Sequence, residues 1–234
     1  MARDGGGRIG SIEAGRGRAS LLVATRSAHK LRELRELLGP LTAELVGLDD
    51  IAIPGDAIED GATFAANAAK KARFFAALAG LPTLADDSGL EVDVLNGAPG
   101  VHSARFAALE KSENSHDADN NTKLLRLLEK VPLEKRTARF RCVIALALVP
   151  WGKIECASPV CFADEMETQI FDGACEGRIQ FSASGHGGFG YDPLFVPDGF
   201  TQSFAELGET VKNQLSHRAQ ALIKLKAFLK AGRD

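Results

Sequence analysis

The chain has 234 residues, of which 45% are hydrophobic and 25% charged, as expected for a folded globular protein and not for a disordered one. Its formal net charge of −3 gives no overall attraction to nucleic acid or to an anionic membrane, so any polyanion site must be a local basic cluster. No apolar run approaches the ~20 residues of a membrane span. We therefore expect neither a nucleic acid nor a membrane as a partner.

The first 18 residues contain six glycines and four arginines and show no apolar periodicity. They also lack the apolar core of a secretory signal. A flexible tail or an over-long start is the favoured interpretation, and an arm that touches RNA is the alternative. The sequence predicts a flexible tail over 1–19 and one domain over 20–234.

Residues 21–24 form a short apolar run typical of a buried strand. Leucines at i, i+3 and i+7 predict a helix over 28–38, with Ser27 as its N-cap and Gly39-Pro40 as its end. The later predicted elements are a helix over 63–79, strands over 83–85 and 90–94, a helix over 121–130, a strand over 137–149, strands near 167–171 and 175–181, and a helix over 216–230. Together these elements predict an α/β fold in two lobes, with a mixed sheet flanked by helices.

Four cysteines, Cys142, Cys156, Cys161 and Cys175, show no C-x-x-C spacing and have no histidine at a zinc-like interval. We expect them to be reduced core thiols of a cytoplasmic protein.

The turn from Thr25 to Lys30 joins the first predicted strand to the first predicted helix. Free backbone N–H groups and the positive end of the helix dipole point into such a turn, so it can bind phosphate, and Lys30 adds a full charge. Many helices begin with Ser and a nearby Lys, so this signal is weak by itself.

Two adjacent acids, Asp86 and Asp87, follow an apolar run. Side chains alternate along a strand, so one acid can enter a cleft while the other turns back into a hydrogen-bond network. Carboxylate oxygens suit Mg²⁺, and Glu59 is the candidate second ligand. The alternative is a capped turn at Ser88-Gly89 with solvated acids.

Thr63, Asn67 and Lys71 are four residues apart and share one helix face. A solvated polar stripe is the alternative to a functional face.

Two later stretches complete the set of candidates. Residues 185–193, GHGGFGYDP, put Phe189 on a glycine-rich loop, where it can stack on a base or pack in the core. Residues 212–221, KNQLSHRAQA, let Ser216 cap the last helix with His217 and Arg218 in its first turn. Cations are unfavourable at that end of a helix, which indicates an anion or an acceptor in front of them.

Taken in order, the stretches ATRSAHKLREL, IEDGATFAANAAKKA, LADDSGLEVDVLNGAPGVHSARF, GGFGYDPLF and KNQLSHRAQA resemble the inosine triphosphate pyrophosphatase family over residues 20–231. The resemblance implies an elongated α/β fold with an active-site cleft between two lobes, a homodimer and Mg²⁺. It also implies hydrolysis of ITP, dITP or XTP to the monophosphate and pyrophosphate.

The same resemblance implies roles for individual residues. Asp87 corresponds to the acid/base and metal residue, and Glu59 to a further metal ligand, with Ser88 beside the metal. The turn Thr25, Arg26, Ser27, Ala28, His29 and Lys30, together with Lys71, corresponds to the triphosphate contacts. The loop Phe189, Gly190, Tyr191 and Asp192 corresponds to the base-stacking loop, and Lys212, His217 and Arg218 to phosphate and base contacts.

One position departs from the family pattern. Ser27 stands where the family usually has Asn; it keeps the N-cap but has a shorter reach and no amide donor. Two alternative functions remain open: a related pyrophosphatase for other modified nucleotides, and a nucleotide sensor without turnover.

The N-terminal tail yields the first testable prediction. Deleting residues 1–18 should leave the melting temperature and the turnover number nearly unchanged, because the stretch has no apolar face to pack. Both are measured on the full and the shortened chain, and a large loss of either would show that the tail packs or closes the site.

Overall fold

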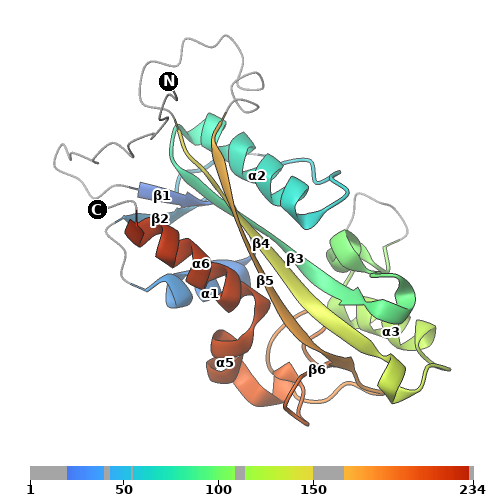
Figure 1. Cartoon of the computed structure of the whole chain (residues 1–234). Helices are drawn as coiled ribbons and strands as arrows, with labels where there is room; N and C mark the ends of the chain where they lie inside the picture. Colours follow the sequence, from blue (N-terminus) through green and yellow to red (C-terminus); the bar gives the residue numbers. More distant parts are fainter. Residues whose placement is uncertain (1–19, 40–42, 54, 109–113, 150–165, 232–234) are drawn as a thin grey trace, which may run out of the picture.

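One mixed sheet of six strands forms the centre of the molecule, in the order β2-β1-β3-β4-β5-β6 (Figure 1). This computed structural model describes residues 20–39, 43–53, 55–108, 114–149 and 166–231, so the tail, Cys156 and Cys161 lie outside the described residues. The first strand is parallel to both of its neighbours, and the remaining pairs are antiparallel. The strands are β1 Ser20–Val23, β2 Glu44–Gly47, β3 Thr83–Val92, β4 Thr137–Ala147, β5 Thr168–Ile179 and β6 Phe195–Pro197.

The first two helices begin at capping residues, whereas the third begins at Asp117, four residues before the predicted start at 121. Ser27 Oγ accepts from the N–H of Lys30 at the start of the first helix, and Thr63 Oγ1 accepts from that of Ala66 at the start of the second. Gly80 ends the second helix in the left-handed region, with φ 65°. The helices are α1 Ala28–Leu38, α2 Phe64–Ala79, α3 Asp117–Leu127, α5 Phe204–Leu215 and α6 His217–Ala231, with short 3₁₀ turns at Asp93–Leu95, Gly100–Arg105 and Leu133–Lys135.

Two predicted pairs of short strands are each one long strand, so those predictions were wrong. The acids lie inside β3, where Asp86 is opposite Ile144 and Asp87 opposite Val143, and the turn predicted at Ser88-Gly89 does not form. The predicted strands near 167–171 and 175–181 are the single strand β5. Both misreadings treated an internal glycine or polar residue as a strand end.

The glycines in these long strands admit close neighbours. A Cβ at Gly89 would lie 2.4 Å from Ser103 Oγ, and a Cβ at Gly173 would lie 2.1 Å from the carbonyl oxygen of His217. Each glycine therefore lets another segment lie against the sheet at backbone distance. At Gly173 that segment is the start of α6.

Three elements were not predicted at all. The strands β2 and β6 are only four and three residues long, too short for an alternating pattern. The helix α5 is broken at Gly208, whose φ is 77°, so its apolar periodicity is interrupted.

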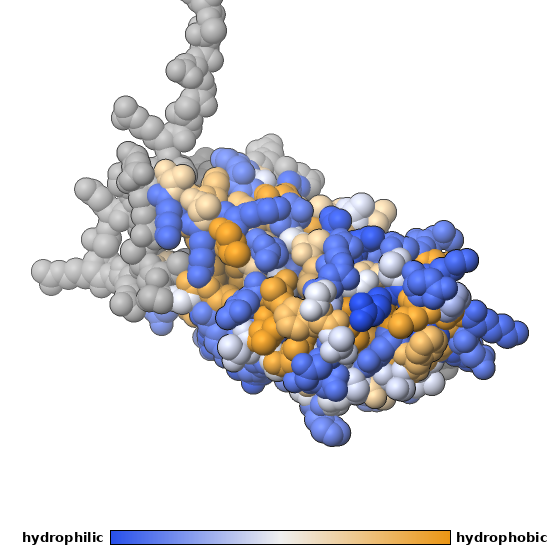
Figure 2. Space-filling view, turned by 60° about the horizontal axis from the view of Figure 1, so that its bottom comes forward, coloured by the Kyte–Doolittle hydropathy of each residue, from blue (hydrophilic) through white to orange (hydrophobic). Residues whose placement is uncertain are grey.

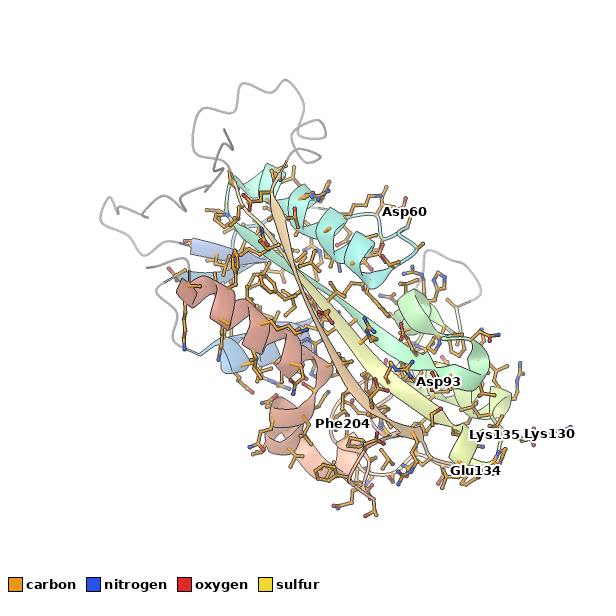
Figure 3. All side chains as sticks on the ribbon, viewed as in Figure 1. Asp60, Asp93, Lys130, Glu134, Lys135 and Phe204 are labelled. Atoms are coloured by element: carbon orange, nitrogen blue, oxygen red, sulfur yellow. The ribbon has the colours of Figure 1, made fainter. Side chains whose placement is uncertain are left out.

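Three apolar clusters define two lobes (Figure 1). In the upper lobe, α2 covers one face of the sheet and α1 with α6 covers the other. In the lower lobe, the far ends of β3, β4 and β5 pack with α3, β6 and the start of α5, where Phe204 is buried (Figure 3). Because β3, β4 and β5 run through both lobes, one set of strands holds the lobes together, and the elongated two-lobed α/β fold is confirmed.

Within the described residues, Cys142 and Cys175 are free, buried thiols, as predicted. Burial raises the pKa of each to about 12. None of the described helices has the length and apolar character needed to cross a membrane. The face of the molecule shown in Figure 2 is largely hydrophilic, with smaller hydrophobic areas.

The close approach of α6 to β5 gives the second prediction. Gly173→Ala should lower the free energy of unfolding by about 1–3 kcal/mol, because the new methyl group meets helix backbone that cannot rotate away. Urea unfolding of this variant is compared with Ala174→Ser, an exposed neighbour on the same strand that should stay within about 0.5 kcal/mol of the parent. If Gly173→Ala and the parent have equal free energies of unfolding, α6 can move away from β5 without cost.

Candidate active site

The candidate residues meet beside β3, where this strand extends past β1. The register pairs β1 with Thr83 and Leu84 only, and the chain then turns away into α1. The side of β3 from Ala85 onward is therefore open to side chains from other elements. The first turn of α1, the first half of α2, the 185–192 loop and the α5–α6 junction all contribute to this place.

Asp86 is a buried anion surrounded by cations. Its Oδ2 accepts from Arg218 Nη2 at 2.9 Å and lies 3.3 Å from Lys30 Nζ. Burial opposes its ionisation, yet Lys30, Arg218 and Lys71 together hold the pKa of Asp86 well below its usual range. This carboxylate is therefore charged at any physiological pH and orients the cations around it.

Asp87 points to the opposite face of the sheet and has a different environment, as strand alternation predicted. Its Oδ2 accepts from Asn67 Nδ2 at 3.1 Å, and its Oδ1 from the N–H of Ser88 at 3.1 Å. Burial, with a contribution from Glu59, raises its pKa to about 6 against the opposing effect of Lys71 and Lys30. Asp87 can therefore take up or release a proton near neutral pH.

The polar face of α2 is buried against this acid. Asn67 is 1% exposed, and its Oδ1 accepts from the N–H of Gly61 at 2.7 Å. Lys71 forms an ion pair with Glu59 and donates to the carbonyl oxygen of Asp86 at 3.2 Å. The alternative of a solvated stripe is wrong for Asn67 and Lys71, although Thr63 is an exposed helix cap.

The side chains of the turn at the start of α1 point in two directions. Thr25 Oγ1 accepts from the N–H of Ser27 at 3.1 Å, and Lys30 reaches Asp86. The guanidinium of Arg26 instead binds Asp49, Asp56 and two carbonyl groups nearby. Arg26 is thus engaged away from Asp86 and Asp87, which leaves the backbone of the turn and Lys30 as the candidate phosphate contacts.

The glycine-rich loop presents Phe189 and does not bury it in the core. Gly188 and Gly190 have φ of 75° and 62°, and a Cβ at Gly188 would lie 2.2 Å from Asp192 Oδ2. That oxygen accepts from the N–H of Phe189 at 2.9 Å, which fixes the loop. Tyr191 is buried and donates to the carbonyl oxygen of Ser103 at 2.9 Å, so it supports the loop from behind.

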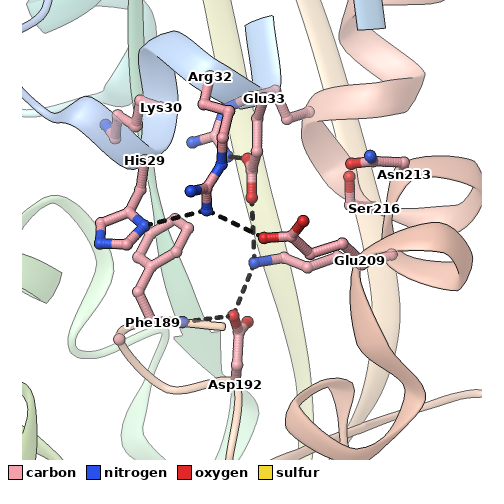
Figure 4. Close-up of polar contacts among 12 residues, drawn as sticks. His29, Lys30, Arg32, Glu33, Phe189, Asp192, Glu209, Asn213 and Ser216 are labelled. Carbon is pink, nitrogen blue, oxygen red and sulfur yellow. Dashed lines mark hydrogen bonds and ion pairs between the residues drawn. The ribbon is translucent and has the colours of Figure 1, made fainter. Parts of the chain in front are cut away.

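The junction of α5 and α6 supplies buried cations (Figure 4). Lys212 Nζ lies 2.6 Å from Asp192 Oδ2 and 3.3 Å from Glu33 Oε1. Arg218 pairs with Asp86 and with Glu33. The anion expected in front of this helix is therefore present, and it is a pair of the protein's own carboxylates.

His217 is buried behind the junction and stacks on Phe140 with ring centroids 4.9 Å apart. Burial, together with the positive charges of Arg218 and Lys212, lowers its pKa well below the usual value, so the imidazole is neutral. Its expected contact with a substrate stays a prediction.

Sequence reasoning missed Glu33. It lies one helical turn after Lys30 on α1, and it joins Lys212 and Arg218 although they are about 180 residues away in the chain. The i, i+3 spacing of Lys30 and Glu33 was the one available signal. A cavity of about 50 Å³ lies beside Glu33, lined by His29, Arg32, Glu33, Gly188, Phe189, Phe204, Gly208, Glu209 and Lys212.

Glu59 and Asp87 are the residues that could hold a divalent cation. Besides burial, the charge of Glu59 raises the pKa of Asp87, and Lys71, which forms an ion pair with Glu59, lowers it. The described residues contain no group of three His, Cys, Asp or Glu side chains placed to ligate a metal by themselves. A pair of carboxylates without a complete cage fits Mg²⁺, which binds through one or two carboxylates together with substrate phosphates and water.

A second hollow of about 540 Å³ lies beside the start of α2 and residues 96–102. Of the candidate residues named from the sequence, only Thr63 lines it.

The fold and the site define an α/β protein in which a helix-start turn meets paired acids and buried cations beside the central sheet. The chain belongs to the Ham1 family, whose model matches residues 21–228. This agrees with the resemblance seen in the sequence motifs.

Named relatives cover nearly the whole chain. A dITP/XTP pyrophosphatase of Desulforamulus reducens is 48% identical over 209 residues, covering 89% of this chain and 94% of that protein. One of Nocardia farcinica is 46% identical over 219 residues, covering 92% and 97%. Among solved structures, a HAM1 protein from Coxiella burnetii matches with a TM-score of 0.77 at 38% identity, covering 91% of this chain and 99% of that one.

The raised pKa of Asp87 gives the third prediction, for metal-free protein. Below the unfolded pKa of 3.8 the side chain is neutral in both states, and as pH rises through about 6 the folded state must carry a buried charge and loses stability. Asp87→Asn removes this loss. The gain in free energy of unfolding from the substitution should therefore be larger at pH 8 than at pH 5, by about 1 kcal/mol.

Urea unfolding in chelator at the two pH values measures this difference. Asp60→Asn is the control, because that carboxylate is fully exposed beside the start of α2 (Figure 3). A gain for Asp87→Asn that is equal at both pH values would show that Asp87 titrates normally.

Proposed function

We propose that this protein hydrolyses deaminated purine nucleoside triphosphates, namely ITP, dITP and XTP, to the nucleoside monophosphate and pyrophosphate with Mg²⁺. The names and identities of its relatives support this proposal. The observation that carries it is the contrast within the acid pair: Asp86 is permanently ionised among cations, and Asp87 titrates near pH 6 beside Glu59.

The triphosphate has cationic partners on two helices. Lys30 extends from the first turn of α1, where unpaired N–H groups and the helix dipole favour negative charge. Lys71 approaches from α2 on the other side of β3. A triphosphate lying across the open side of β3 would thus have an ammonium group at each side.

Asp87 is placed to act as the general base. Asn67 and the N–H of Ser88 fix the carboxylate, and its pKa of about 6 leaves it mostly ionised at neutral pH while still able to accept a proton. A water held by Asp87 forms a bond to the α-phosphorus and passes its proton to the carboxylate, while the bond from that phosphorus to the bridging oxygen breaks and pyrophosphate leaves. Glu59 and Asp87 are the residues that would hold Mg²⁺, and the ion would neutralise charge on the phosphate oxygens.

Base selection follows from hydrogen-bond polarity. Hypoxanthine and xanthine carry a 6-oxo acceptor where adenine carries an amino donor, so donors such as Arg218 favour the deaminated bases. Arg218 is fully buried and held by Asp86 and Glu33, which would keep its remaining N–H in place. We also propose that the protein is a cytoplasmic homodimer, in keeping with the sequence resemblance.

Two other functions remain as alternatives: a related pyrophosphatase for other modified nucleotides, and a sensor that binds nucleotides without turnover. Pyrophosphate release measured across a panel of nucleoside triphosphates separates all three.

The acid pair gives the fourth prediction. Asp87→Asn should reduce turnover by ~10²–10⁴ and raise the Mg²⁺ concentration needed for half-maximal rate, because it removes the base and one metal ligand. Asp86→Asn should instead lower the free energy of unfolding by about 3–5 kcal/mol, because it leaves Arg218 buried without its full counter-charge. Pyrophosphate release and urea unfolding are measured on both variants.

The comparison can fail in two informative ways. If Asp86→Asn abolishes turnover in a stable protein while Asp87→Asn stays active, the two roles are reversed. If neither variant slows pyrophosphate release tenfold, the pair is structural and the proposed mechanism is wrong.

A further inference from the structure

The ring of Phe189 is flanked by polar side chains. The imidazole of His29 stacks on it, with ring centroids 5.6 Å apart and planes 21° from parallel, and Lys212 Nζ lies 4.3 Å from the ring centroid (Figure 4). An aromatic ring that lines a cavity and contacts a histidine and a lysine is not packed for core stability.

His29 differs from its neighbours in the first turn of α1. Lys30 reaches Asp86 and Arg26 binds Asp49 and Asp56, but the exposed imidazole of His29 extends toward the 185–192 loop. Arg32 Nη2 lies 3.5 Å from its Nδ1 and pairs with Glu209 at 2.9 Å. The imidazole is thus held above the loop by a bridge between α1 and α5.

We propose that His29 and Phe189 form the two walls of the purine site and that the base inserts between their rings. This inference rests on the proposed function and deepens it. It moves the side chain of His29 from the triphosphate contacts to the base, while the backbone of the turn keeps its part in binding phosphate.

The spacing of the rings fits this role. A flat base between two aromatic rings needs about 7 Å between the walls, twice the ~3.5 Å of optimal carbon contact. The present centroid distance of 5.6 Å closes the slot, and the adjoining cavity of about 50 Å³ is too small for a purine. Binding therefore requires the walls to separate by about 1–2 Å, which the exposed His29 and the glycine-flanked Phe189 permit.

The position of the slot also matches the rest of the site. His29 directly precedes Lys30, so the slot adjoins the proposed triphosphate cradle. The same cavity is lined by Glu33 and Lys212, whose charges would face an edge of the inserted base. Stacking is insensitive to base identity because every base has a π-face, so the walls supply affinity and the polar edge supplies selection.

The test uses full-length His29→Ala and His29→Phe, with pyrophosphate release from ITP and XTP and calorimetric binding of IMP as readouts. His29→Ala should raise the KM for ITP and the Kd for IMP about five- to a hundredfold, with kcat within twofold and the ITP-to-XTP ratio of kcat/KM unchanged. His29→Phe should retain most of the affinity, because it preserves a flat wall. His102→Ala, a change of an exposed histidine in the 3₁₀ turn Gly100–Arg105 outside the site, should match the parent.

Two results would contradict the role of His29, and a third would contradict the proposed function itself. If the parent releases pyrophosphate but His29→Ala leaves KM and Kd within twofold, His29 is not a wall. If His29→Ala lowers KM, the histidine only blocks the slot, and the inference is also overturned. If the parent itself releases no pyrophosphate from ITP or XTP, the proposed function fails first, and that result is seen before any variant is compared.

Discussion

The buried carboxylate of Asp86 is the constraint on which the arrangement of the site depends. It lies in the middle of β3 and is contacted by Lys30 from α1 and Arg218 from α6, while Lys71 from α2 binds its backbone carbonyl. These contacts tie three helices to one residue of the central sheet. A buried ion pair of this kind adds little net stability relative to apolar residues, but loss of either partner leaves an uncompensated charge. The main effect of the ion pairs of Asp86 is therefore to fix the positions of Arg218 and Lys30, and their net contribution to the stability of the fold is small.

Glu33 extends this constraint to the lower lobe. It pairs with Arg218 and Lys212, and Lys212 in turn pairs with Asp192 at the base of the Phe189 loop. A continuous chain of opposite charges thus runs from the sheet to the loop that would bind the base. Displacement of any one charge disturbs its neighbours, because each cation in the chain has two acidic partners. The loop and the acid pair are in this way held in one geometry although different lobes carry them.

The sequence predicted what depends on local chemistry. Ser27 was correctly predicted as the N-cap of α1, and the predicted end of the second helix at residue 79 was also correct. The opposite directions of Asp86 and Asp87 follow from strand alternation and were also correct. The strands containing Gly89 and Gly173 were each wrongly predicted as two short strands. Glycine inside a strand can allow the close approach of a distant segment as readily as it can form a turn. The role of Glu33 was invisible for the same reason, since its partners are far away in the chain and only the folded structure brings them to α1.

The charge balance of the site explains why Asp87, and not Asp86, is the acid available for chemistry. Four acids, Glu33, Glu59, Asp86 and Asp192, lie in ion pairs with four cations, Lys30, Lys71, Lys212 and Arg218. Asp87 is the fifth acid and forms no ion pair of its own within the described residues, and its burial raises its pKa, with a smaller contribution from the charge of Glu59. In the proposed function, a magnesium ion would offer that carboxylate a counter-charge, and a triphosphate would compete with Glu59 for Lys71. Bound magnesium would thus supply the counter-charge that the protein's own side chains do not give Asp87.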